Sequence, residues 1–370
     1  MKAAIFHAEA GYGHKKVALM IEKALQAAGL PEKEAEVFDA LELTSAHFRY
    51  SYPAIYFNAV KWIPKLWGWF YEVLDHDRIY PLLKPLRSFL NRLEGRQWLA
   101  WVRKENPEWV VCCHFFTAEV FSRARQEGLI QSKVLVVITD FAPHTFWVHA
   151  GADHYWVMTE EAKTELMRRG MAAARITAGG IPVDPAFKPS GRKAQILREQ
   201  GLESGRLTLL LTSGSFGLSP MDEILRAMEP FKDRVQALCV TGNNKVLKNK
   251  LEGLSFPFPV KIFGFVNFMP ELMEAADLLV AKTGGATSVE SLAKGLPLVI
   301  FQPIPGQETR NADYLKKRFA SFSMERPDQI GIILKNIFED PALLAQKKKV
   351  IAEIARPDSA AAIAQFILKH

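Results

Sequence analysis

The feature that most constrains the fold is a regular alternation of short apolar runs and amphipathic segments over the second half of the chain. Five apolar runs begin at Arg206, Val235, Val260, Asp277 and Leu296, and a segment with helical periodicity follows each of them. Apolar runs without polar alternation are typical of strands buried on both faces, as in parallel sheets. Because parallel strands need a crossover connection, usually a helix, the alternation predicts a parallel α/β unit.

The first half of the chain has the same pattern in a less regular form. Its apolar runs predict six strands: KAAIFH, EAEVFDA, EWVVCCH, KVLVVITD, HYWVMT and ARITAGG. A helix is expected from about 14 to 28, because apolar residues recur there at helical spacing and Gly29 and Pro31 follow. Residues 45–104 interrupt the rhythm and predict several inserted helices.

The length of 370 residues fits two domains, because single hydrophobic cores stop growing near roughly 250–300 residues. We therefore predict an N-terminal domain over 1–180, a Pro- and Gly-rich linker over 181–205 and a C-terminal domain over 206–350. The final segment, 351–370, is expected to be a helix that packs back on the N-terminal domain.

Composition narrows the class of partner without choosing one. The formal net charge of +7 suits an anionic partner, which could be a nucleic acid, an anionic membrane or a phosphorylated ligand. No window offers the uninterrupted apolar stretch of a membrane-spanning helix. The three cysteines lack metal-binding spacing, so we expect buried reduced thiols and no metal site.

Two strand-to-helix turns in the second half could hold an anion. The first, LTSGSFG, contains Ser213, Gly214, Ser215 and Phe216. Its glycines allow close approach of the backbone, and free N–H groups at a helix start favour a diphosphate. An ordinary turn accounts for this motif equally well. The second turn contains Lys282, Thr283, Gly284 and Gly285, and its helix carries Glu290.

A third motif, QPIPGQETRNADYL, places Gln307, Glu308 and Asn311 after another predicted strand. These polar side chains suit sugar hydroxyls, although each could also belong to a plain polar loop. In open α/β sheets, ligands bind outside the carboxyl ends of the strands. All three motifs follow strands of the same half, so one ligand could contact all of them.

These motifs are part of a longer resemblance. Segments 11–18, 138–166, 179–187, 211–217 and 263–315 resemble the monogalactosyldiacylglycerol synthase and processive diacylglycerol glucosyltransferase family. That family is itself similar to the peptidoglycan N-acetylglucosaminyltransferase that makes lipid II. The resemblance implies a GT-B fold, with two Rossmann-like parallel-sheet domains facing across a cleft. It also implies inverting transfer of glucose or galactose from a UDP-sugar to diacylglycerol, with no cofactor or metal.

The resemblance also implies roles for individual residues. The diphosphate would contact the turn 213–217 and the turn from Lys282 to Gly285, with Phe265 near the uracil. Glu290 would bind the ribose, and Gln307 with Glu308 the hexose. On the acceptor side it implies that His14, at the end of Gly11, Tyr12 and Gly13, lies in the cleft near the acceptor. His144, close to Asp140 in the sequence, is a further candidate for acceptor binding.

Inversion needs a base opposite the departing UDP, and histidine titrates near the working pH. His14 is our first candidate for this base and Asp140, at the end of VLVVITD, the second. Each of the two residues has an alternative role. His14 could bind phosphate at a helix start, and Asp140 could cap a helix or fix a loop.

The helical insertion holds five of the eight tryptophans, interleaved with lysine and arginine. This mixture suits the headgroup region of an anionic bilayer and predicts a peripheral protein on the cytoplasmic face of the cell membrane. Packed aromatic side chains are the alternative. Nucleic acid is disfavoured because no binding motif is visible. A lipid II-type transferase and a UDP-sugar epimerase-like protein remain rival functions, because fold alone does not decide function.

Overall fold

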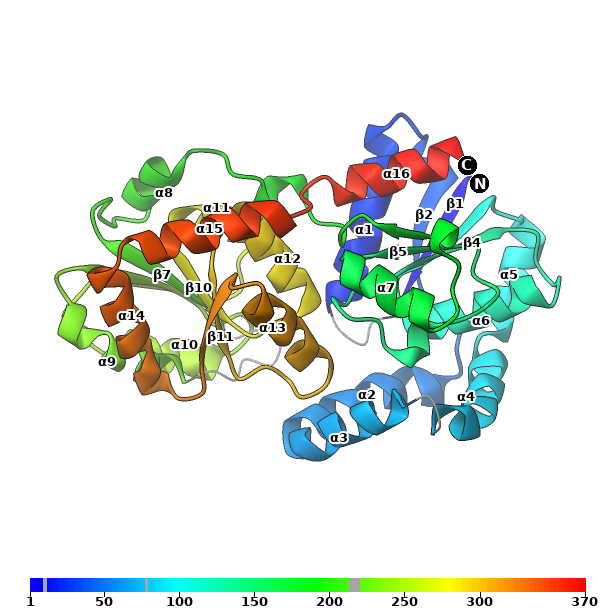
Figure 1. Cartoon of the computed structure of the whole chain (residues 1–370), viewed down its shortest axis with the longest axis horizontal. Helices are drawn as coiled ribbons and strands as arrows, with labels where there is room; N and C mark the ends of the chain where they lie inside the picture. Colours follow the sequence, from blue (N-terminus) through cyan, green and yellow to red (C-terminus); the bar gives the residue numbers. More distant parts are fainter. Residues whose placement is uncertain (9–11, 77–78, 213–219) are drawn as a thin grey trace. The chain divides into compact units, whose positions relative to one another are not determined.

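The computed structural model describes residues 1–8, 12–76, 79–212 and 220–370, and it divides into two compact units (Figure 1). Unit 1 consists of Met1–Asp184, Ile304–Asn311 and Asp358–His370. Unit 2 consists of Pro185–Pro303 and Ala312–Pro357. Each unit contains one six-stranded parallel sheet, which confirms the predicted α/β class with two parallel-sheet domains.

The sheet of unit 1 has the strand order β2-β1-β3-β4-β5-β6. Its strands are β1 (Ala3–His7), β2 (Ala35–Asp39), β3 (Trp109–Cys112), β4 (Lys133–Val137), β5 (His154–Val157) and β6 (Ile176–Ala178). All six lie within the predicted runs. β1, β3 and β4 are almost wholly buried, which explains why their sequences are continuously apolar rather than alternating.

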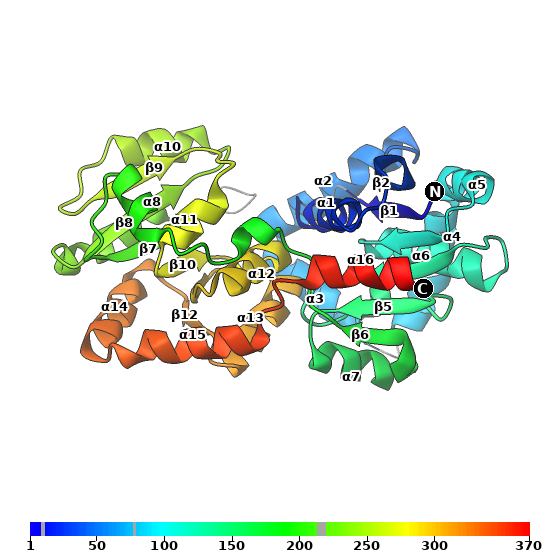
Figure 2. The same cartoon turned by 90° about the horizontal axis from the view of Figure 1, so that it is seen from above.

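Helices cover both faces of this sheet. They are α1 (Tyr12–Ala27), α6 (Phe115–Gln126), α7 (Glu160–Arg168) and α16 (Ser359–Lys369), with short 3-10 turns at Glu32–Glu34, Thr145–Trp147 and Ala173–Arg175. Phe116 and Phe121 of α6 belong to a core cluster with Phe6 and Val136 of the sheet. α16, the last helix of the chain, packs against α1 (Figure 2).

The predicted helical insertion forms four helices: α2 (Ala46–Trp62), α3 (Pro64–Leu74), α4 (Tyr80–Glu94) and α5 (Arg96–Glu105). The Ser45 hydroxyl accepts a hydrogen bond from the N–H of Phe48 and caps α2. Pro64 begins α3, where its fixed φ and missing N–H cost nothing. Within the described ranges, no helix is both long enough and apolar enough to cross a membrane.

The sheet of unit 2 has the order β12-β11-β10-β7-β8-β9. Its strands are β7 (Leu207–Thr212), β8 (Val235–Val240), β9 (Val260–Phe263), β10 (Leu278–Ala281), β11 (Leu298–Phe301) and β12 (Ser321–Met324). Five were predicted. The edge strand β12 was not, because its sequence Ser-Phe-Ser-Met alternates between polar and apolar residues and is only partly buried.

The helices of unit 2 follow its strands at the predicted places. They are α8 (Lys193–Glu199), α9 (Met221–Ala227), α10 (Lys245–Glu252), α11 (Met269–Ala275), α12 (Gly285–Lys294), α14 (Ile330–Glu339) and α15 (Ala342–Ile354), with 3-10 turns at Pro185–Phe187, Glu229–Phe231 and Pro327–Gln329. Helix α13 (Gln307–Lys317) begins in unit 1 and ends in unit 2.

Most of the segment expected as a linker is fastened to unit 2. The buried Lys294 ammonium donates to the carbonyls of Ala186 and Lys188 and pairs with Glu274 at 2.9 Å. The Glu274 carboxylate also accepts hydrogen bonds from the N–H groups of Ser190 and Gly191. A buried charge pair with these extra hydrogen bonds holds the backbone of 185–191 on unit 2.

Candidate functional site

A pocket with about 270 Å³ of empty volume lies inside unit 1, at the carboxyl ends of its strands. It is lined by His14, Tyr71, Phe115, Asp140, His144, Phe146, Trp147 and Gln307, and we call it the Asp140 pocket. From β1 the chain continues to β2 on one side of the sheet, and from β3 to β4 on the other. The boundary between β1 and β3 is therefore a topological switch point, where open α/β sheets bind ligands.

His14 lies in the first turn of α1, which follows β1, and its ring contacts the chain just after β3 and β4. Its Nδ1 lies 2.9 Å from the carbonyl oxygen of Cys113, directly after β3, and 3.0 Å from the Thr139 hydroxyl. A carbonyl oxygen only accepts, so Nδ1 carries the proton of the neutral ring and the lone pair is on Nε2. Burial lowers the pKa of His14 to about 4, which keeps the ring neutral at pH 7.

Asp140 lies just after β4 and is buried, with 4% of its surface exposed. Its carboxylate accepts hydrogen bonds from Trp147 Nε1, at 3.2 Å, and from Gln307 Nε2. Burial raises the pKa of Asp140 to about 6, although both hydrogen bonds act in the opposite direction. The pocket thus contains a carboxylate that is mostly ionised at pH 7 and changes charge just below it. This perturbation is typical of functional sites.

His144 uses both ring nitrogens inside the protein. Its Nε2 donates to the carbonyl of Tyr71 at 2.9 Å, and its Nδ1 accepts from the N–H of Phe146 at 3.1 Å. Burial lowers its pKa to about 4. The side chain therefore joins α3 to the turn at 144–147, and it presents its ring rather than a free nitrogen to the pocket.

The three polar residues of the third motif belong to unit 1, whereas the sequence grouped them with the C-terminal domain. Gln307 donates to Asp140, and Asn311 accepts a hydrogen bond from the N–H of Phe141 at 3.0 Å. The Glu308 carboxylate accepts one from the N–H of Ile304 at 2.8 Å. The sequence signal was their position after β11, and it did not reveal their pairing with the chain beyond β4.

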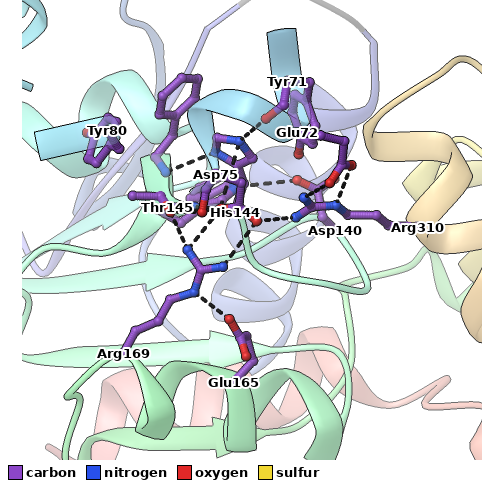
Figure 3. A network of polar contacts seen from close by, with 12 residues as sticks. Tyr71, Glu72, Asp75, Tyr80, Asp140, His144, Thr145, Glu165, Arg169 and Arg310 are labelled. Atoms are coloured by element: carbon purple, nitrogen blue, oxygen red, sulfur yellow. Dashed lines mark hydrogen bonds and ion pairs between the residues drawn. The ribbon is translucent and has the colours of Figure 1, made fainter. Parts of the chain in front are cut away.

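A half-buried charge cluster lies beside the pocket (Figure 3). Asp75, just after α3, pairs with Arg169 at 2.8 Å and with Arg310 at 2.6 Å. It also accepts hydrogen bonds from the N–H and the hydroxyl of Thr145, each at 2.7 Å. These partners outweigh the cost of burial and hold the pKa of Asp75 well below its usual range.

Most of the described donor residues predicted in unit 2 lie after β10, which adjoins β7 where this sheet reverses its connection. Gly284 caps α12, Gly285 begins it, and Thr283 is fully buried. Glu290 is buried within α12, with 6% of its surface exposed, so it is not a solvated charge on the helix surface. Phe265 follows β9 and is 69% exposed, as an aromatic side chain that stacks on a ligand would be.

Some predicted residues fall outside the described ranges. These are Gly11 of the acceptor motif and Ser213, Gly214, Ser215 and Phe216 of the first donor turn. Tyr12 and Gly13 form the first residues of α1. Within the described part of the chain, no group of three His, Cys, Asp or Glu side chains is arranged to hold a metal ion.

Sequence reasoning missed four residues whose polar groups lie in or beside the pocket, Tyr71, Asp75, Trp147 and Arg310, and also the lining rings of Phe115 and Phe146. Trp147 and Arg310 stand inside segments that carried the family resemblance, so they could have been found there. Tyr71 and Asp75 stand in the helical insertion, where no motif distinguishes them from their neighbours.

Comparison with known families accounts for both halves of the chain. Residues 14–183 match the family model described as monogalactosyldiacylglycerol (MGDG) synthase. Residues 208–355 match the model described as the glycosyltransferase family 28 C-terminal domain.

Individual relatives agree with this result. The processive diacylglycerol beta-glucosyltransferase of Bacillus subtilis (strain 168) is 31% identical over 237 residues, which are 63% of this chain and 62% of that protein. The enzyme of the same name from Bacillus cereus (strain 03BB102) is 27% identical over 377 residues, covering 99% of this chain and 93% of its own length.

Among solved structures, the crystal structure of MurG from Acinetobacter baumannii covers 100% of both chains, with a TM-score of 0.66 and 15% sequence identity. At that identity the likeness concerns the fold alone, which is GT-B. The two family matches follow one another along the chain, and a curated relative aligns over nearly all of it. Over nearly its whole length the chain is therefore similar to the monogalactosyldiacylglycerol synthase and processive diacylglycerol glucosyltransferase family, whose synthase model matches its N-terminal half.

Proposed function

We propose that this chain transfers glucose from UDP-glucose to the hydroxyl of diacylglycerol, with inversion at the anomeric carbon. The names of the relatives favour glucose, and galactose is the alternative sugar. The observation that carries the proposal is the Asp140 pocket, where a neutral histidine and a carboxylate line one cavity at the switch point of the sheet. A histidine with a lone pair on Nε2 that faces the pocket could take the proton of an acceptor hydroxyl.

In the proposed reaction, the acceptor hydroxyl donates to His14 Nε2. The acceptor oxygen forms a bond to the anomeric carbon of glucose while the bond from that carbon to the diphosphate oxygen breaks. The proton passes to His14, and the resulting imidazolium is stabilised by the ionised Asp140 carboxylate that lines the same pocket. UDP departs with the bonding electrons.

Unit 2 supplies the groups that suit the departing UDP. We assign the diphosphate to Lys282 and the free N–H groups at the start of α12, which favour negative charge. The ribose is assigned to Glu290, whose carboxylate would accept from its hydroxyls. Because these groups can neutralise the leaving charge, the proposal needs no metal ion or other cofactor.

The outer surface of the helical insertion supports docking to a lipid surface. Helix α4 is inverted relative to an ordinary surface helix: its buried side is polar, and Ser88 and Asn91 donate to the buried Glu119 carboxylate. Its outer side carries Leu82, Leu86 and Phe89, which are 79%, 62% and 64% exposed. Exposed apolar patches of this kind mark interaction surfaces.

Helices α2 and α3 extend the exposed apolar surface with Trp62 and Trp69, which are 71% and 58% exposed. Exposed Lys61, Lys65 and Lys84 accompany it, and Lys61 lies over the Trp62 ring at 4.9 Å. Aromatic and basic side chains together suit the headgroups of an anionic bilayer. We propose the cytoplasmic face of the cell membrane as its location, and the free, buried cysteines fit that compartment.

The proposal is tested with purified protein and anionic vesicles that contain diacylglycerol. Radiolabelled UDP-glucose, UDP-galactose and UDP-N-acetylglucosamine are supplied in parallel, with and without a chelator. We expect labelled glycolipid from UDP-glucose at a rate that the chelator leaves unchanged.

Each rival function gives a different product. If glycolipid forms from UDP-galactose alone, the transferred sugar is galactose rather than glucose. Conversion of UDP-N-acetylglucosamine without lipid would indicate an epimerase, and its transfer to a lipid-linked acceptor would indicate a lipid II-type enzyme. Release of UDP from none of the donors would contradict the proposal.

A further inference from the structure

The segment Ile304–Asn311 belongs to unit 1 although it follows strand β11 of unit 2, and helix α3 makes close contacts that help to hold it there. Gly68 of α3 leaves the space that Pro305 fills, because a Cβ at position 68 would lie 2.4 Å from the Pro305 Cβ. Gly306 has a φ of +97° and lies against the Tyr71 ring, where a Cβ would come within 2.9 Å. Two close approaches that require glycine therefore fix this segment on α3.

Arg310 adds a polar anchor to the same contact. Its guanidinium forms a two-point hydrogen bond with Glu72 of α3, at 3.0 and 2.7 Å, and a third bond with Asp75 at 2.6 Å. It also lies 5.2 Å from the centre of the Tyr71 ring. This fork geometry uses the planar, multidentate character of arginine, which lysine does not reproduce.

Arg310 and Gln307 are three residues apart in the first turn of α13, so they share one face of the helix. One end of this face is bound to α3 through Arg310, and the other donates to Asp140 through Gln307. We propose that Arg310 is a positioning residue that holds Gln307 on the Asp140 carboxylate and thereby sets the charge state of the pocket. This inference rests on the proposed function.

The charge of Asp140 depends on what surrounds it. The polar and titratable groups around it are His14 from α1, Tyr56 from α2, Tyr71 from α3, His144 and Trp147 from the turn, and Gln307 with Arg310 from α13. Only three of them lower its pKa: the hydrogen bonds from Gln307 and Trp147, and the positive charge of Arg310. Loss of Arg310 removes one of these effects directly and weakens the Gln307 hydrogen bond, so the pKa of Asp140 rises.

The test is the pH dependence of kcat, because a change in stability alone does not move a titration midpoint. The ionised Asp140 is the active form, so activity falls as pH drops through its pKa. In Arg310→Ala we expect this acidic limb to lie at a reproducibly higher pH than in the wild type. Gln307→Ala should move it in the same direction, with a higher KM for UDP-glucose.

A double-variant cycle separates positioning from independent contributions. If Arg310 acts through Gln307, the double variant Arg310→Ala/Gln307→Ala shifts the limb by clearly less than the sum of the two single shifts. The inference is overturned if the shift in the double variant equals the sum of the two single shifts, or if the limb does not move in Arg310→Ala. Arg310→Lys keeps the charge and loses the fork, so it should fall between wild type and Arg310→Ala.

The controls keep the result interpretable. Arg326 of unit 2 makes a comparable two-point bond with Asp328 at the surface, and Arg326→Ala should leave the limb in place. Asp75 keeps Arg169 and Thr145 as partners in Arg310→Ala, which favours folding of that variant. Faster amide hydrogen exchange over 304–311 in Arg310→Ala, and not in Arg326→Ala, is expected whatever the reaction is. A wild-type protein without glucosyl transfer would contradict the proposed function, whereas an active wild type with no shift would contradict only the role of Arg310.

Discussion

The carboxyl ends of the two sheets differ in the kind of group that they present. Unit 2 has three strands on each side of its switch point, with β7 and β10 at the centre. Unit 1 has two strands on one side and four on the other, and the chain forms helices α2–α5 where unit 2 continues to β9. After its second strand, unit 1 therefore has a helical wall with an apolar outer surface, whereas unit 2 has the edge strand β9 at the corresponding point of the chain.

The chemistry follows this difference. The Asp140 pocket collects titratable side chains whose pKa values are moved by burial, which suits proton transfer. The end of β10 offers Lys282 and the start of α12, which suit a fixed negative charge. Under the proposed function, the two sheets would therefore have different tasks, proton transfer in unit 1 and stabilisation of negative charge in unit 2.

The largest expected effect belongs to the proposed base. His14→Ala should lower kcat by about 10³-fold or more, because general base catalysis typically contributes factors of this order. The affinity for UDP should remain near the wild-type value, since His14 belongs to unit 1. Steady-state kinetics and calorimetric titration with UDP measure the two quantities. His47, exposed on α2, provides the matched histidine control. A His14→Ala protein that retains kcat and loses UDP affinity would assign His14 to the donor instead.

The next effect concerns the charge of Asp140. Its pKa is raised to about 6, so its negative charge is present above that pH and is lost as pH falls from 7 to 5. Wild-type kcat should fall over this window. Asp140→Asn should be slower by about 10²-fold, as for loss of one preorganised electrostatic group, and should lack this limb. If kcat of Asp140→Asn still falls over the same pH range, a group other than Asp140 is responsible for the titration.

A third prediction concerns unit 2. Glu290→Ala should raise the Kd for UDP by about tenfold or more, because a hydrogen bond to a charged group is worth roughly 1.5–3 kcal/mol. The pH limb of kcat should stay in place, since Glu290 does not line the Asp140 pocket. Glu339→Ala, on the exposed end of α14, is the control. Equal UDP affinity in Glu290→Ala and wild type would remove the ribose assignment.

The smallest expected effect concerns the helical wall. Lys65→Gln should weaken binding to anionic vesicles by about fivefold, because one basic residue near such a surface contributes about 1 kcal/mol. Binding to uncharged vesicles should be unchanged. Vesicle sedimentation measures both, and Lys335→Gln on α14 of unit 2 serves as the control. The same loss in both variants would mean that charge acts on the whole protein rather than through this wall.

Sequence patterns anticipated the elements of regular structure better than the contacts around the pocket. The buried strands could be predicted because a strand covered on both faces has a continuously apolar sequence. Strand β12 was missed because its sequence is not continuously apolar. His14 and Asp140 could be named as candidates because each follows a strand that local patterns predict. Their shared pocket could be expected from parallel topology, since carboxyl ends of neighbouring strands meet at one edge.

Other parts of the site had no local signal. Asp75 and Arg310 are 235 positions apart in the chain, and no periodicity links two residues at that separation. The placement of Gln307 and Asn311 in unit 1 depends on contacts with α3 and with the chain after β4, so reading the segment by its neighbours in sequence assigned it to the other unit.

The hydrogen bond from His14 to the Cys113 carbonyl has a consequence for how this protein can vary. The tautomer of a catalytic histidine is often fixed by a carboxylate, which a single substitution can remove and which titrates with pH. Here the fixing group is part of the main chain, so every residue type at position 113 offers it and no pH abolishes it. Natural or designed changes at position 113 are therefore limited by packing beside the sheet. The orientation of the His14 ring depends on the main chain and not on the side chain at that position.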